Sequence, residues 1–155
     1  MRENCNFLQP CYIKKNTQEL RDELRKLGLR CCNGKAWGKY LCTFYNPYLH
    51  EMMFVGSPEW DLKNNPSILT SIDCGTNEDL FLAIAALRND TDKYQWFVNN
   101  TYNKLWCLCI ENTFHFETYP DLHTCASFIS LGECVDAKDE WHKAAVRELI
   151  EHFKI

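Results

Sequence analysis

The chain has 155 residues, of which 46% are hydrophobic and 25% charged, and its formal net charge is -4. These values are typical of one globular domain, so we expect a single α+β domain over residues 1–155, and the negative charge argues against duplex DNA as a partner. No apolar run approaches the ~20 residues that cross a bilayer. The first residues also lack a signal-peptide core, so we predict a cytoplasmic protein that does not bind a membrane.

The ten cysteines would indicate a disulfide framework in a secreted protein. In a cytoplasmic chain we expect most of them to stay reduced, with no disulfide needed for folding. Cys42, Cys107 and Cys109 stand inside apolar runs, where a free cysteine commonly serves as a small core residue.

The chain begins with signals for a strand and a helix. We predict a strand at 11–14 and a helix at 18–27, which Asn16 or Thr17 caps and Gly28 ends. This helix should bury only one side, because its apolar residues form a single narrow stripe at Leu20, Leu24 and Leu27. Its solvent side offers a pair with i,i+4 spacing, Asp22 and Lys26.

Three strands are predicted next, at 29–32, 37–45 and 48–55. Turn signals separate them at Asn33-Gly34 and Asn46-Pro47. Together they indicate an antiparallel meander.

The strongest secondary-structure signals lie in the middle of the chain. A strand at 68–72 is followed by Gly75, which breaks it, and by a capping-box pattern of Thr76 and Asp79. Residues 80–87 are apolar on every side of a helix. We therefore predict a buried helix, from Thr76 to Leu87, at the centre of the fold.

The last part of the chain reads as a hairpin, a short strand and a closing helix. Residues 94–98 and 104–110 should pair as the hairpin, and 114–117 alternates like a strand. Asp136 is placed to cap a helix over 137–153, whose apolar stripe is Trp141, Ala145, Leu149 and Phe153.

These elements predict an antiparallel sheet packed around a buried central helix, with two flanking helices. Ile13-x-x-x-Thr17-x-Glu19 and Ile72-x-x-x-Thr76-x-Glu78 share their spacing, and each opens a helix after a strand. A duplicated β-α-β-β unit would explain this match, but capping chemistry alone can bring Thr and Glu to such junctions.

Two patterns could carry chemistry. Cys74 precedes a helix N-terminus, where a thiol can become an acidic nucleophile, but the carboxylates around it favour a purely structural turn and cap. The repeated glycines and the lysine of a phosphate-binding loop are missing. His123, Cys125 and Cys134 are the best zinc candidates, although they lack paired knuckle spacing. We predict no catalytic residue, no metal and no cofactor.

Recognition is more readily placed on loops. We expect ligand or partner contacts in the 56–67 loop and the poorly patterned 111–135 segment. Trp60 could equally pin its loop to the core, and His115 and Glu117 share one side of a short strand. The candidate binding residues are Trp60, His115, Glu117 and His123.

Two stretches carry a family resemblance. I-D-C-G-T-N-E-D-L-F-L-A-I-A-A-L-R-N-D-T-D-K-Y-Q-W-F-V, at 72–98, resembles a block in uncharacterised small proteins encoded by phages and prophages of Bacteroides-like gut bacteria. Y-I-K-K-N-T-Q-E-L-R-D-E-L-R-K-L-G is similar to how those proteins open. The resemblance implies an intracellular protein of a mobile element, and such genes often encode accessory or counter-defence factors. It brings no activity, cofactor or site residue.

The sequence contains none of the common nucleophile, metal or glycine-rich motifs. We therefore expect a non-enzymatic binding protein that occupies a host protein or captures a small ligand. The alternative is a small enzyme acting on a nucleotide or nucleic acid, because catalytic groups often meet only in the fold.

Overall fold

The computed structural model describes residues 9–32, 37–58, 71–88, 93–101, 106–110, 113–116 and 141–154. Within these ranges it is a mixed α+β fold, as predicted, with three helices and two sheets. The chain divides into two compact units, residues 1–87 with 150–155 (unit 1) and residues 88–149 (unit 2). One domain over 1–155 stays a prediction. No helix in the described part of the chain is both long and apolar enough to cross a membrane.

Within the described residues, the sheet of unit 1 has five strands in the order β2-β4-β3-β1-β5. Their bounds are Cys11–Ile13 for β1, Arg30–Cys31 for β2, Tyr40–Asn46 for β3, Glu51–Ser57 for β4 and Ile72–Asp73 for β5. β3 runs antiparallel to both β4 and β1, whereas β5 joins β1 in parallel. This sheet is therefore mixed, not purely antiparallel as predicted.

The predicted antiparallel meander is wrong at its first strand. β2 lies beside β4 in parallel, with Arg30 opposite Met53 and Cys31 opposite Phe54. β3 already has β1 on one edge and β4 on the other, so β2 pairs with the outer edge of β4. The Asn33-Gly34 turn, on which the meander depended, lies outside the described residues.

Helix α1 spans Gln18–Lys26 and begins where the sequence predicts. The Thr17 hydroxyl accepts a hydrogen bond from the Leu20 N–H at 3.2 Å. Gly28 follows the helix with a φ of 100°, a conformation that favours glycine. Leu20 and Leu24 are buried, which confirms that the helix buries one side.

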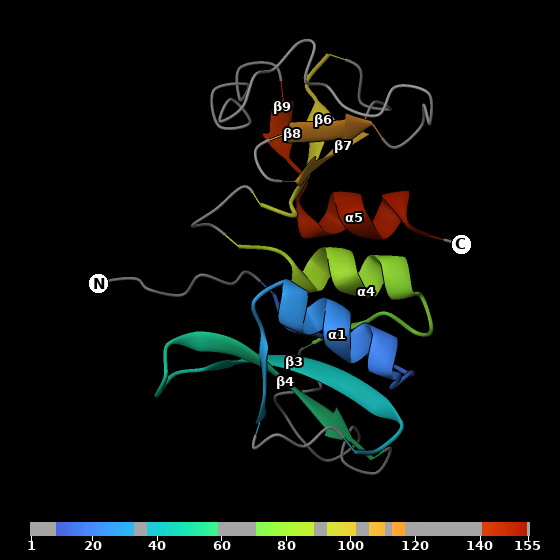
Figure 1. The fold of residues 1–155 in the computed structure, drawn as a ribbon. Coiled ribbons are helices and arrows are strands. Elements are labelled where there is room, and N and C mark those ends of the chain that lie inside the picture. The colour runs from blue at the N-terminus through green and yellow to red at the C-terminus, as the bar shows by residue number, and fades with distance from the viewer. Residues whose placement is uncertain are drawn as a thin grey trace. The chain divides into compact units, whose positions relative to one another are not determined.

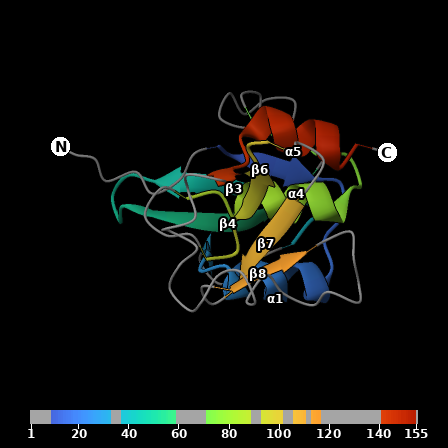
Figure 2. The ribbon, with the colours of Figure 1, turned by 90° about the horizontal axis from the view of Figure 1, so that it is seen from above.

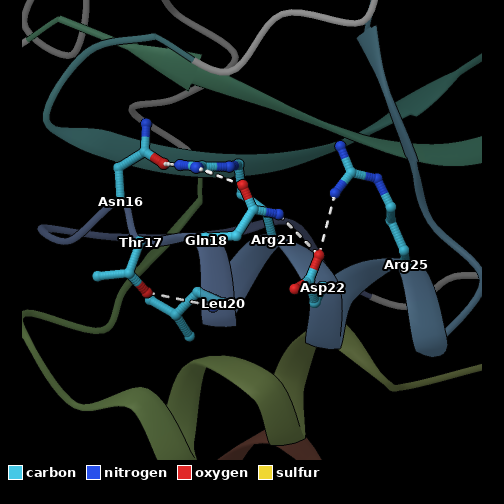
Figure 3. A network of polar contacts seen from close by, with 7 residues as sticks. All are labelled: Asn16, Thr17, Gln18, Leu20, Arg21, Asp22 and Arg25. Atoms are coloured by element: carbon cyan, nitrogen blue, oxygen red, sulfur yellow. Dashed lines mark hydrogen bonds and ion pairs between the residues drawn. The ribbon is translucent and has the colours of Figure 1, made fainter.

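The solvent side of α1 carries a chain of polar contacts (Figure 3). The Gln18 side chain accepts a hydrogen bond from the Arg21 guanidinium at 2.9 Å and donates one to Asp22 at 2.8 Å. Arg25 reaches the same Asp22 carboxylate at 3.4 Å. Asp22 thus pairs with Arg25 at i,i+3 rather than with Lys26 at i,i+4. Such exposed pairs contribute little to stability, so this face is a solvated surface.

Helix α4 spans Glu78–Ala85 and lies with α1 on one face of the unit 1 sheet (Figure 1). Five of its eight residues are buried, namely Leu80, Phe81, Ala83, Ile84 and Ala85. It packs against β1 and α1, so its apolar residues contact protein on more than one side.

The predicted cap of α4 at Thr76 is wrong, because Asn77 holds that position. The Asn77 side-chain oxygen accepts a hydrogen bond from the Leu80 N–H at 3.1 Å. One turn earlier, the Asp73 carboxylate accepts a hydrogen bond from the Gly75 N–H at 2.8 Å, and Gly75 has a φ of 59°. This extra turn leaves Thr76 exposed and outside the helix.

In the described part of unit 2, four antiparallel strands form a sheet in the order β8-β7-β6-β9. Their bounds are Trp96–Asn99 for β6, Trp106–Ile110 for β7, Thr113–Phe116 for β8 and Trp141–Lys143 for β9. The predicted hairpin is confirmed, since β6 pairs with β7. The Trp96 and Trp106 rings meet edge to face across it, with centroids 6.3 Å apart.

The helix predicted over 137–153 is wrong in its first half. Trp141 lies in β9, which hydrogen-bonds the edge of β6 that β7 leaves open. Helix α5 spans only Val146–His152, and the Glu148 carboxylate accepts a hydrogen bond from the Ala145 N–H at 2.9 Å. That contact fastens the first turn of the helix, as in one half of a capping box. The predicted cap, Asp136, lies outside the described residues.

Candidate functional site

Most of the predicted binding residues fall in parts of the chain that the structure does not describe: Trp60, Glu117 and His123. His115 lies in β8, where it stands opposite Leu108 of β7. The roles of all four residues stay predictions.

The described surface has a prominent apolar feature at the turn between β3 and β4. Tyr48 is 91% exposed and Leu49 is 52% exposed. Figures 1 and 2 show this turn projecting beyond the ends of α1 and α4. The sequence predicted the turn at Asn46-Pro47 but placed Tyr48 in the following strand. Because β4 begins only at Glu51, Tyr48 and Leu49 lie in the turn itself.

The β3–β4 turn is held in one conformation by short-range contacts. The Asn46 side-chain oxygen accepts hydrogen bonds from the N–H groups of Tyr48, at 2.9 Å, and Leu49, at 3.1 Å. The Tyr45 hydroxyl lies 3.2 Å from Nδ1 of His50, whose φ of 55° lets the chain reverse. An Asn side chain that binds its own turn is a common device for fixing such loops. The backbone that carries the Tyr48 and Leu49 side chains is therefore restrained by hydrogen bonds.

Unit 1 also has a pocket of about 340 Å³ at the start of α4. Its apolar lining is Cys74, Leu80 and Ile150, and its polar lining is Thr76, Asn77, Glu151 and Lys154. The Asn77 amide donates a hydrogen bond to the Phe153 carbonyl at 2.6 Å. That bond holds the 150–154 segment against the start of α4.

Cys74, the candidate nucleophile, lies among core contacts. Its thiol is 3.9 Å from the Ile72 carbonyl and lies close enough to the Cys11 thiol to affect the pKa of that group. Burial raises the pKa of the Cys11 thiol well above its usual value, and the contact with Cys74 raises it further. Reactive cysteines are generally accessible, whereas Cys74 is only 4% exposed, so its surroundings favour a structural role. Cys42, Cys107 and Cys109 are buried, as predicted.

Unit 2 contains a polar cluster around His142. Its Nε2 lies 2.9 Å from one Glu148 carboxylate oxygen and 3.1 Å from the other, and its Nδ1 lies 2.7 Å from the Asn100 side-chain oxygen. Partial burial disfavours the charged carboxylate. The pKa of Glu148 nevertheless lies below its usual value, because the Ala145 N–H and His142 stabilise the ionised form. A carboxylate thus orients an exposed imidazole, an arrangement that can transfer protons.

Within the described ranges, no group of three or more His, Cys, Asp or Glu side chains is placed to hold a metal ion. The zinc candidates His123, Cys125 and Cys134 lie outside those ranges, so the absence of zinc stays a prediction.

No family model, curated protein or solved structure matches this chain.

Proposed function

We propose that this is a non-enzymatic binding protein that occupies a partner protein through the β3–β4 turn. The observation that carries the proposal is the exposure of Tyr48 and Leu49 on a turn that Asn46 holds in place. Tyrosine is enriched among the few residues that dominate binding energy at protein interfaces. Loops on a rigid scaffold are also where recognition is commonly placed.

The shape of the turn indicates the kind of partner. Two neighbouring side chains on a projecting turn need a narrow apolar pocket, with a hydrogen-bond acceptor for the Tyr48 hydroxyl. Burying each side chain would contribute about 1.5–3 kcal/mol. Because Asn46 already restrains the backbone of the turn, little backbone conformational entropy is lost on binding.

The resemblance of residues 12–32 and 72–98 to phage and prophage proteins supports a host protein as the partner. A cytoplasmic location in the host cell, and a counter-defence role exerted by blocking that protein, belong to the same proposal.

A matched pull-down tests the proposal. The wild-type chain and the Tyr48→Ser/Leu49→Ser variant would each be exposed to host cytosol, and Trp37→Ser would serve as the control. Trp37 is 61% exposed but precedes β3, so it lies outside the turn. We expect a partner that wild type and Trp37→Ser retain and the double variant loses. Equal capture by all three well-folded proteins would refute a role for the turn.

A second candidate function is a small enzyme acting on a nucleotide or nucleic acid. The observation in its favour is the His142 cluster, where Glu148 and Asn100 orient an exposed imidazole. Native mass spectrometry of the freshly purified protein tests this function. A retained nucleotide that is released chemically changed by wild type, but not by His142→Gln, would favour the enzyme over the binding protein.

We also propose two features of the architecture that the sequence predicts. Helix α4 is the buried centre of the fold, and the chain contains a duplicated β-α-β-β unit. In support, β1-α1-β2-β3 and β5-α4-β6-β7 follow the same order of elements. β1 and β5, the first strand of each set, also lie side by side in parallel.

A further inference from the structure

The pocket at the start of α4 can take a ligand of its own, apart from the β3–β4 turn. Its volume of about 340 Å³ lies near the lower end for ligand pockets, about 300 Å³, so it suits a small molecule. Cys74, Leu80 and Ile150 give it an apolar surface. Such a pocket would receive a compact apolar group.

The polar lining carries one positive and one negative side chain, Lys154 and Glu151. Among the residues that the structure describes, the Lys154 ammonium and the Glu151 carboxylate have no ion-pair or hydrogen-bond partner. The Thr76 hydroxyl also forms no hydrogen bond with these residues. Asn77 differs, because its oxygen binds the Leu80 N–H and its amide binds the Phe153 carbonyl. Three polar groups of the lining are thus available to a ligand.

We propose that this pocket binds a small zwitterion with an apolar side chain, of the class of apolar α-amino acids. The side chain packs on Cys74, Leu80 and Ile150. The ligand carboxylate faces Lys154 and the Thr76 hydroxyl, and its ammonium faces Glu151. A ligand with a single charge would leave one of the two lining charges without a counterpart, so a zwitterion is preferred.

One neighbouring negative charge is already paired. Glu78, in the first turn of α4, forms an ion pair with Lys15, which reduces its repulsion of the ligand carboxylate. The hydrogen bond from Asn77 to the Phe153 carbonyl joins the start of α4 to the 150–154 segment, so the two sides of the pocket are in place without a ligand. Such preorganisation reduces the cost of binding.

Three probes with the same phenyl ring test the proposal: L-phenylalanine, 3-phenylpropanoate and 2-phenylethylamine. They carry both charges, the carboxylate alone and the ammonium alone. Binding is followed by NMR of the Leu80 and Ile150 methyl groups. We expect L-phenylalanine to bind about two- to fivefold more tightly than either singly charged probe, the range for exposed charge pairs. Unmoved Leu80 and Ile150 signals with all three probes, or equal affinities, would overturn the proposal.

Charge-removing variants assign each contact. Lys154→Gln should reduce the affinity for L-phenylalanine to that of 2-phenylethylamine, and Glu151→Gln should reduce it to that of 3-phenylpropanoate. Lys39→Gln, an exposed cation outside the pocket, is the control and should change nothing. Variants that leave the affinity unchanged would overturn the assignment. Tyr48→Ser/Leu49→Ser should bind L-phenylalanine like wild type, so this proposal and the protein-binding proposal fail separately.

Discussion

Asn77 makes two side-chain hydrogen bonds, and removing them tests how α4 begins. One bond caps the helix through the Leu80 N–H, and the other reaches the Phe153 carbonyl. Asn77→Ala removes both, Asn77→Ser can keep the cap alone, and Thr76→Ala removes a side chain that does not cap. The three variants therefore separate the two bonds and test the position of the cap.

The structure gives an expected size for each change. Losing a cap costs about 0.5–2 kcal/mol, and losing an ordinary hydrogen bond costs about 0.5–1.5 kcal/mol. Asn77→Ala should therefore lower the free energy of unfolding by about 1–3.5 kcal/mol. Asn77→Ser keeps the cap and loses only the bond to the Phe153 carbonyl, so it should lower the free energy of unfolding by about 0.5–1.5 kcal/mol. Thr76→Ala should stay within about 0.5 kcal/mol of wild type, as expected for an exposed site without a special contact.

Urea denaturation followed by far-UV circular dichroism measures all three variants. The expected order of destabilisation is Asn77→Ala, then Asn77→Ser, then Thr76→Ala. If Thr76→Ala were as destabilising as Asn77→Ala, the cap would lie at Thr76 and the assignment of α4 would be wrong.

Three further outcomes are expected. Ile84 is only 1% exposed, so Ile84→Asp should abolish soluble expression while Ile84→Val costs about 0.5–1.5 kcal/mol; an Asp variant that melts like wild type would contradict this. Thermal melts with and without reductant should superimpose, and a drop of many degrees on reduction would reveal a stabilising disulfide. The lowered pKa of Glu148 means that its stabilisation is present above the unfolded-state pKa and is lost as the pH falls through the folded-state value. Glu148→Gln should therefore flatten the loss of stability in acid below about pH 4.5, and an unchanged slope would show that Glu148 does not contribute.

Local signals in the sequence predicted α1 well. Thr17 and Gly28 act through atoms within one turn of themselves, so a cap and a stop could be recognised without knowing the rest of the fold. The start of α4 was harder to predict, because Thr76 and Asn77 can both cap a helix. The neighbouring turn between Asp73 and Gly75 decides between them.

Long-range pairing could not be predicted from local patterns. β2 pairs with β4 because β1, from earlier in the chain, occupies an edge of β3. Trp141 fits an apolar helical stripe, but its backbone pairs with the open edge of β6 and forms a strand. The same limit applies to the candidate site. Asn46-Pro47 marked a turn, whereas the exposure of Tyr48 depends on where β4 begins.

The order of the chain has a consequence for synthesis on the ribosome. Unit 1 contains residues 150–155, which are made only after all of unit 2. At about 5–20 residues per second, that delay lasts several seconds. During this time Asn77 lacks its Phe153 partner, and the pocket lacks the wall that Ile150, Glu151 and Lys154 provide. A nascent chain can thus form the β3–β4 turn before its pocket, which is completed only after unit 2 has been made. Translation stopped before Ile150 would therefore leave a chain with the turn and without the pocket.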